Sequence, residues 1–275
     1  MNDEIIKPAG PEKELPGLFG LFRSSLLVYR KRFPSFIPIL LLFTVPLALV
    51  SYIGAGALSE AGEKGAFEGG AVLAGFAVAF LLSILGQIAF IYAIAFEGLS
   101  MGEVFGRSAE RFFSFFKVYL LYALIIFSGL VFLVIPGIIF SIWFGFAPFI
   151  LAREDVRGVD ALLKSKEYVK GNWSRVFGLL LAVWLVSFAL SLIPYAGHIL
   201  SIFFIPFVLV YEYLLYEGLK ERKGGDFAFQ PSRSDRISWL VIGSLGLLIF
   251  IVLGLLLIRT RPEVPEIIIT PTEQV

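Results

Sequence analysis

The sequence contains no cysteine and a single histidine, His198. Disulfides, thiolate metal sites and cysteine nucleophiles are therefore excluded, and thiols give no information on compartment. A histidine metal pair one helical turn apart is also excluded, and we expect His198 to lie in a turn. The sequence further lacks a phosphate-binding P-loop and a Gly-x-Ser-x-Gly nucleophile elbow. These absences favour a protein that is not an enzyme and that carries no metal or cofactor.

Charged residues are scarce as well. They make up 16% of the 275 residues, against about 25% in a typical soluble domain. The formal net charge is +1, so the strongly basic surface of a nucleic-acid-binding protein is absent. In contrast, 58% of the residues are hydrophobic and the mean hydropathy is +0.87. The composition predicts an all-α integral membrane protein.

Five apolar runs are long enough to cross a hydrocarbon core of about 30 Å. Two of them exceed one crossing, and we expect Pro136-Gly137 and the segment 194–197 to divide them as tight turns, because proline lacks a backbone N–H and glycine turns freely. The predicted spans are then 35–55, 71–96, 118–135, 138–152, 175–193, 197–216 and 237–258. The fourth rises only about 22 Å, so it requires local thinning of the bilayer or a partly buried end.

The distribution of basic residues supports this count. Of the 23 Lys and Arg residues, 20 fall on one side of the predicted membrane, in the segments 1–34, 97–117, 153–175 and 217–237. The opposite side holds three, in the loop 56–70 and the tail 259–275. Because basic side chains resist translocation, we expect a cytoplasmic-membrane protein with its N-terminus inside and its C-terminus outside. A six-span alternative, in which 138–152 does not cross, would scramble this asymmetry.

Three charged segments with helical periodicity precede three of the spans and indicate an internal repeat. Their stripes follow steps of three and four residues: Phe19, Phe22, Leu26, Tyr29 and Phe33; Phe105, Ser108, Phe112, Phe115 and Tyr119; Val159, Leu162, Lys166, Val169 and Trp173. Each predicts an amphipathic interfacial helix followed by a membrane hairpin. The segments Phe146–Phe149 and Phe204–Phe207 repeat a Phe-x-Pro-Phe pattern after the two proline turns. The alternative is that basic amphipathic segments simply accompany membrane spans.

The predicted organisation has five parts. These are a disordered cytoplasmic tail (1–17), a six-span core of three repeat units (18–216), a cytoplasmic linker (217–236), an additional transmembrane helix (237–258) and a flexible C-terminal tail (259–275).

Two polar residues interrupt the predicted spans and are candidates for an intramembrane polar site. Gln87 follows a stripe of small residues in the second span, where its amide could bond to a neighbouring helix or contact a solute. Glu212 aligns with Glu154 of the preceding unit, so we expect it at the inner headgroup level, within an aromatic belt. A buried proton or cation site is the alternative for Glu212.

Two basic clusters are candidate contacts for anionic lipid headgroups on the cytoplasmic face. Each basic residue near such a leaflet contributes about 1 kcal/mol. The candidates are Arg30, Lys31, Arg32, Lys164, Lys166 and Lys170. Topology alone is the default explanation of these clusters, and binding of a specific headgroup is the hypothesis beside it. The bilayer is the expected partner, and a protein partner or a second copy of the chain stays open.

Several segments resemble one family. They are Ile135–Ile138, Phe146–Phe149, Ala161–Ser165, Lys170–Trp173 and Leu215–Arg222. They are similar to the signature block and last core helix of the membrane domain found with some bacterial glycerophosphodiester phosphodiesterases and in YciC-like multi-span proteins. The resemblance covers roughly residues 17–227 and implies a fold but no reaction, because the hydrolytic activity of the fused enzymes belongs to a separate soluble barrel. The span 237–258 is an addition to the family pattern.

From the sequence we expect a non-enzymatic, lipid-interacting or membrane-assembly component. The alternative is a translocator of a small solute, lipid or ion that uses Gln87 and Glu212, and a membrane-embedded enzyme acting on lipid comes third. A translocator requires a polar cavity that reaches the middle of the membrane, whereas an assembly component requires only exposed apolar or small-residue faces.

Overall fold

The computed structural model describes residues 15–59, 65–194, 196–225, 227 and 229–259. Over these residues the chain forms α-helices and no β-strand. The helices are α1 (Leu18–Ser59), α2 (Gly65–Ala95), α3 (Met101–Phe132), α4 (Val134–Phe144), α5 (Ala147–Glu154), α6 (Val159–Val169), α7 (Trp173–Ser191), α8 (Ala196–Arg222) and α9 (Arg233–Arg259). The predicted all-α fold is confirmed. Both predicted terminal tails fall mostly outside the described residues.

Seven helical stretches of the described chain are long and apolar enough to cross a membrane, which confirms the predicted number. They are Leu18–Ile53, Val72–Ala95, Met101–Val131, Val134–Glu154, Trp173–Ser191, Ile199–Arg222 and Arg233–Leu256. The fourth combines α4 and α5 into 21 residues, enough for about 30 Å at 1.5 Å per residue. The fourth span is thus longer than the predicted segment 138–152, because it begins at Val134 and ends at Glu154. The chain is a multi-pass membrane protein.

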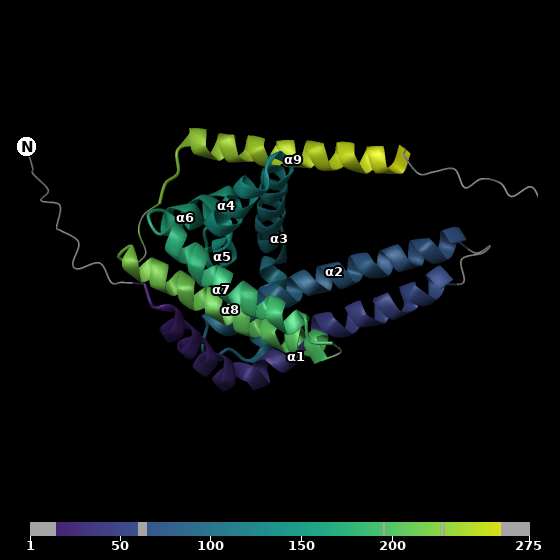
Figure 1. The fold of residues 1–275 in the computed structure, drawn as a ribbon, viewed down its shortest axis with the longest axis horizontal. Coiled ribbons are helices and arrows are strands. Elements are labelled where there is room, and N and C mark those ends of the chain that lie inside the picture. The colour runs from purple at the N-terminus through teal and green to yellow at the C-terminus, as the bar shows by residue number, and fades with distance from the viewer. Residues whose placement is uncertain (1–14, 60–64, 195, 226, 228, 260–275) are drawn as a thin grey trace, which may run out of the picture.

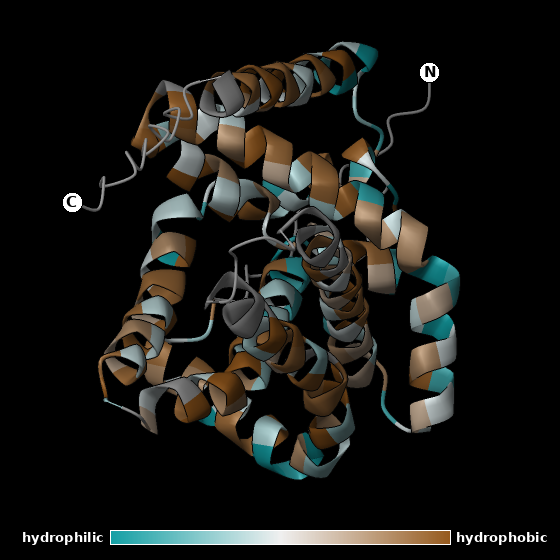
Figure 2. Ribbon diagram, turned by 90° about the vertical axis from the view of Figure 1, so that its right-hand side faces the viewer, coloured by the Kyte–Doolittle hydropathy of each residue, from teal (hydrophilic) through white to brown (hydrophobic). Residues whose placement is uncertain are grey.

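The helices α3 to α8 form a packed body, from which the α1–α2 hairpin and α9 project in the same direction (Figure 1). α9 crosses α3 and contacts it (Figure 1), while α1 contacts both α2 and α8. Hydrophilic residues occupy only short stretches of the helices (Figure 2). Large apolar side chains stay exposed on the projecting helices, among them Leu41 (54%) and Phe250 (61%). Such a surface is unsuited to water and suited to hydrocarbon.

The predicted boundary between amphipathic helix and span occurs only in the third unit. There α6 ends at Val169 and α7 begins at Trp173. In the first two units the amphipathic segment continues into the span as one helix. α1 instead bends in its first half (Figure 1), where Pro34 and Pro38 each remove a helical hydrogen bond.

The first predicted turn lies three residues before its expected place. The chain breaks at Leu133, and Pro136 stands in the first turn of α4, where a missing N–H needs no partner. Gly129 and Gly137 let α3 and α4 approach closely, since a Cβ on Gly129 would lie 2.9 Å from the Gly137 nitrogen. Small residues at the crossing, rather than the proline, therefore hold this hairpin together.

The linker is also shorter than expected. α8 continues to Arg222 and α9 begins at Arg233, so both helices take residues from the predicted 217–236 segment. The extension of α8 follows from packing, because Tyr216 and Leu219 are buried in the core.

Substituting Gly129→Ala is expected to destabilise the protein by about 1–3 kcal/mol, the usual cost of overpacking a tight contact. The added methyl group meets backbone atoms of Gly137, which cannot rotate away. The thermal midpoint of the detergent-solubilised protein measures the effect. Gly178→Ala is the matched control, because nothing lies within 4 Å of its added Cβ. An unchanged midpoint for Gly129→Ala would contradict the close approach of α3 and α4.

Candidate functional site

The two intramembrane polar residues predicted from the sequence line the same cavity. Gln87 comes from α2 and Glu212 from α8, and the cavity they share has a volume of about 450 Å³. Its wall also carries the hydroxyls of Ser187 and Ser201, from α7 and α8. The remaining lining residues are apolar: Ile202, Phe204, Ile205, Val208 and Leu209. Polar groups of three helices thus converge in a largely hydrocarbon-lined space.

A second cavity of about 150 Å³ adjoins the first, and Gln87, Leu209 and Glu212 line both. The smaller cavity is more aromatic and is walled mainly by α3, α4, α5 and α7. Its other lining residues are Ile91, Tyr119, Tyr122, Ser141, Gly145, Phe146, Pro148, Phe149, Leu180 and Trp184. Glu212 therefore stands where a wide apolar space meets a narrow aromatic one.

Glu212 lies deep within its span. It precedes the end of α8 at Arg222 by ten residues, or about 15 Å, which is half of a 30 Å hydrocarbon core. Glu154, with which the sequence aligned it, contacts Tyr216 and Lys220, one to two helical turns further along α8. The repeat alignment is therefore shifted here, and Glu212 is further from the helix end than the expected headgroup position.

Polar groups extend from this depth toward the α7–α8 turn. Ser201 precedes Glu212 by 11 residues of α8, or about 16 Å. Ser187 and Ser201 lie seven residues on either side of Pro194, so the antiparallel hairpin brings them to one level. The Ser187 hydroxyl donates to the Val183 carbonyl (2.9 Å), but the buried Ser201 Oγ has no hydrogen-bond partner among the described residues.

The helices beside the cavities are interrupted. α4 ends at Phe144 and α5 begins at Ala147, and Gly145 and Phe146 of this break line the smaller cavity. Ser165 of α6 provides hydrogen-bond partners for backbone groups at this break. Its hydroxyl donates to the Trp143 carbonyl (2.7 Å) and accepts from the Phe146 N–H (3.2 Å). Irregular backbone at membrane depth is tolerated where it lines a cavity and its groups are paired in this way.

Pro206 weakens α8 without breaking it. The helix continues through Pro206, whose missing N–H leaves the Ile202 carbonyl without its usual partner. Ile202 lines the larger cavity. The two Phe-x-Pro-Phe segments found in the sequence thus flank the cavities, one as a broken helix and one as a proline site within a continuous helix.

Within the described residues, neither the Gln87 amide nor the Glu212 carboxylate has a hydrogen-bond or ion-pair partner. A carboxylate in a low-dielectric space without a partner is costly, and intramembrane acids of this kind mark paths or binding sites. The cavity can therefore offer an anionic group, an amide and hydroxyls to an occupant.

A separate cluster of charges surrounds Glu154 at the end of α5. Its side chain is 4% exposed. The hydroxyls of Tyr168 and Tyr216 donate to its Oε1 atom at 2.9 and 2.5 Å. The ammonium groups of Lys164 and Lys220 form ion pairs with it, the second at 3.6 Å. This charge-compensated cluster connects α5, α6 and α8 and contrasts with Glu212, which has no ion-pair partner among the described residues.

The end of α2 is capped by arginines. Arg32 of α1 donates to the carbonyls of Ala93 (2.6 Å) and Ile94 (2.8 Å), and Arg153 of α5 donates to the last carbonyl of the helix. Arg32 also pairs with Glu97 at 2.6 Å, and this hydrogen bond lowers the pKa of the Glu97 carboxyl below its usual value. Arg32 thus donates hydrogen bonds to carbonyl groups that have no partner within the last turn of the helix.

The other predicted headgroup contacts divide into two groups. Lys164 is 6% exposed in its pair with Glu154, and the ammonium of Lys166 lies 4.8 Å from the Trp143 ring centre and 5.1 Å from that of Trp239. These two lysines are engaged by the protein. Three predicted contacts are exposed: Arg30, Lys31 and Lys170. For these three, headgroup binding stays a prediction.

The sequence analysis missed the polar residues of α3 and α7 that line the cavities. Tyr119 had been assigned to an apolar stripe, yet Tyr119 and Tyr122 are three residues apart and share one helix face toward the smaller cavity. Their spacing was a usable signal, as was the symmetry of Ser187 and Ser201 about Pro194. Over the described residues no three His, Asp or Glu side chains are grouped to hold a metal ion. The side chain of His198 lies outside what the structure describes.

No protein-family model, curated protein or solved structure matches this chain. Its resemblance to the membrane domain of glycerophosphodiester phosphodiesterases stays a prediction.

Replacing Glu154 with Gln is expected to destabilise the protein by about 3–5 kcal/mol, because two buried lysines then lose their counter-charge. The thermal midpoint in detergent measures the loss. Glu167→Gln on α6 is the matched control: its pair with Lys170 is partly exposed and such pairs contribute at most about 1 kcal/mol. Equal midpoints for the two variants would show that the Glu154 cluster does not hold α5, α6 and α8 together.

Proposed function

We propose that this protein translocates a small solute or lipid through the cavity formed around Gln87 and Glu212. One observation carries the proposal: the two polar residues, 125 positions apart in the sequence, converge in one cavity, Gln87 eight residues before the end of α2 and Glu212 ten residues before the end of α8. Neither has a protein partner within the described chain. Polar residues retained at such depth serve a path or a site more often than they serve packing.

The geometry around these residues supports a path. From Glu212 the larger cavity extends to Ser201, whose unpartnered hydroxyl stands near the α7–α8 turn. On the other side, the smaller cavity reaches the break between α4 and α5. Interrupted helices in corresponding positions of a repeat are typical of transporter binding sites. Here the first Phe-x-Pro-Phe segment interrupts a helix between α4 and α5, and the second places Pro206 inside the continuous helix α8.

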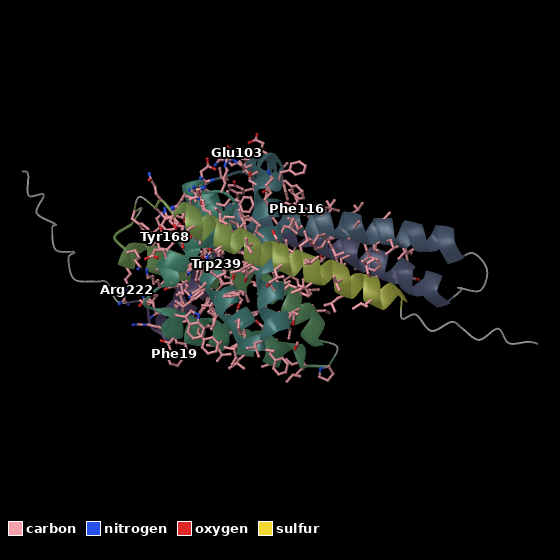
Figure 3. All side chains as sticks on the ribbon, turned by 90° about the horizontal axis from the view of Figure 1, so that it is seen from above. Phe19, Glu103, Phe116, Tyr168, Arg222 and Trp239 are labelled. Atoms are coloured by element: carbon pink, nitrogen blue, oxygen red, sulfur yellow. The ribbon has the colours of Figure 1, made fainter. Side chains whose placement is uncertain are left out.

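The charge distribution supports an orientation. Nitrogen-bearing side chains gather at the end of the molecule that holds Tyr168 and Arg222, whereas the projecting lengths of α1, α2 and α9 carry almost only carbon (Figure 3). We propose that this end faces the cytoplasm, with the α7–α8 turn and the α1–α2 hairpin tip on the outer side of a cytoplasmic membrane.

The assembly role favoured by the sequence alone is less well supported. It requires only exposed apolar faces, which α1 and α9 provide. It gives no physical reason for an unpartnered carboxylate and an unpartnered amide in one cavity. Translocation explains both features, so it takes precedence over the assembly role.

The absence of cysteine allows a direct test by single-cysteine labelling. In proteoliposomes, Gln87→Cys and Ser201→Cys are expected to react with a membrane-impermeant thiol reagent, because both side chains line the cavity and a translocation path must open to water. Gln87→Cys is expected to react with reagent added to either side of the membrane, since a translocation site opens to each side in turn. The labelled fraction is measured by mass shift.

Two controls separate a cavity from dry burial and from lipid exposure. Ser128→Cys replaces a serine buried at the α3–α9 contact, and Leu248→Cys replaces an exposed residue of α9. Both are expected to stay unlabelled. Labelling of Gln87→Cys no faster than these controls, or from one side alone, would refute translocation through this site.

A further inference from the structure

The charge of the cavity points to the class of its occupant. Glu212 is the one charged side chain among the described residues that line either space. No Lys or Arg stands beside it to neutralise the carboxylate, in contrast to Glu154, which has two lysines. An anion would meet an uncompensated like charge in a low-dielectric space, so the cavity disfavours anionic occupants.

The aromatic wall adds a second preference. Tyr119, Tyr122 and Trp184 line the smaller cavity beside Glu212, together with Phe146 and Phe149. The faces of such rings attract ammonium groups, most strongly where water is excluded. A carboxylate and several aromatic rings therefore converge on a position that suits an organic ammonium ion.

The larger cavity accounts for the rest of the occupant. Ile202, Ile205, Val208 and Leu209 give it an apolar wall, and about 450 Å³ lies within the range of small-molecule sites. A metal cation would need several oxygen ligands around one point, whereas here the oxygen-bearing side chains are distributed over two cavities. An apolar wall suits a hydrocarbon body attached to the charged group.

We propose that the cavity binds a lipophilic organic ammonium ion, with its ammonium group paired to Glu212 and its hydrocarbon body against α8. This inference rests on the proposed function, because it names the substrate class of the same site. It assigns Glu212 the role of counter-ion for the occupant, with Gln87 and the Ser201 hydroxyl available to its polar substituents.

Benzyltrimethylammonium is a suitable probe, since it combines a fixed cation with an apolar ring. Equilibrium dialysis with the purified full-length protein is expected to show saturable binding. Glu212→Gln is expected to weaken this binding about tenfold or more, through loss of a charge-assisted contact. Glu221→Gln, on the exposed end of the same helix, is the matched control and is expected to bind as the unchanged protein does.

Measurements on the unchanged protein keep the test independent of how the variant folds. Neopentylbenzene, the neutral carbon isostere of the probe, and benzenesulfonate, an anion of similar ring size, are expected not to displace it. Absence of saturable binding, equal affinity of Glu212→Gln, or equal competition by the neutral isostere would each overturn the ammonium assignment.

The thiol labelling described above distinguishes this failure from failure of the proposed function. Two-sided labelling of Gln87→Cys without ammonium binding would retain translocation and reject the substrate class. Ammonium binding sensitive to Glu212→Gln without two-sided labelling would retain the binding site and reject translocation.

Discussion

The hydrocarbon core of a membrane supplies no hydrogen-bond partner, so each polar group within a span must find one in the protein. Most of this structure follows from that constraint. Helices pair the backbone along each span, and arginines from α1 and α5 take up the last carbonyls of α2. Ser165 pairs both sides of the break between α4 and α5. Glu154 is held by two lysines and two tyrosines.

Against this background the few unpaired groups stand out. Gln87, Glu212 and the Ser201 hydroxyl have no partner among the described residues, and all three line one cavity. The contrast between Glu154 and Glu212 is the most informative, because both are acids packed among aromatic residues. The first is neutralised by the protein and connects three helices. The second has no such counter-charge among the described residues, which is why the cavity rather than the charged cluster is the candidate functional site.

The repeated Phe-x-Pro-Phe pattern shows how one sequence feature produces two local structures. In the first copy Gly145 precedes the pattern and Ser165 pairs the freed backbone groups, so the helix separates into α4 and α5. In the second copy Phe203 stands at the equivalent position, and α8 continues through Pro206. Both copies flank the cavity, yet neighbouring side chains, rather than the proline itself, decided whether the helix broke.

The sequence by itself determined the membrane environment, the seven spans and the two polar residues of the cavity. Each depends on the free energy of placing a residue in hydrocarbon, which is a local property. Only the tertiary structure decided that Gln87 and Glu212 share a cavity, that Tyr119 and Tyr122 line its narrower part, and that Arg32 caps α2 instead of standing free. These outcomes depend on which helix faces meet, and that follows from the packing of small residues such as Gly129 and Gly137 between distant segments.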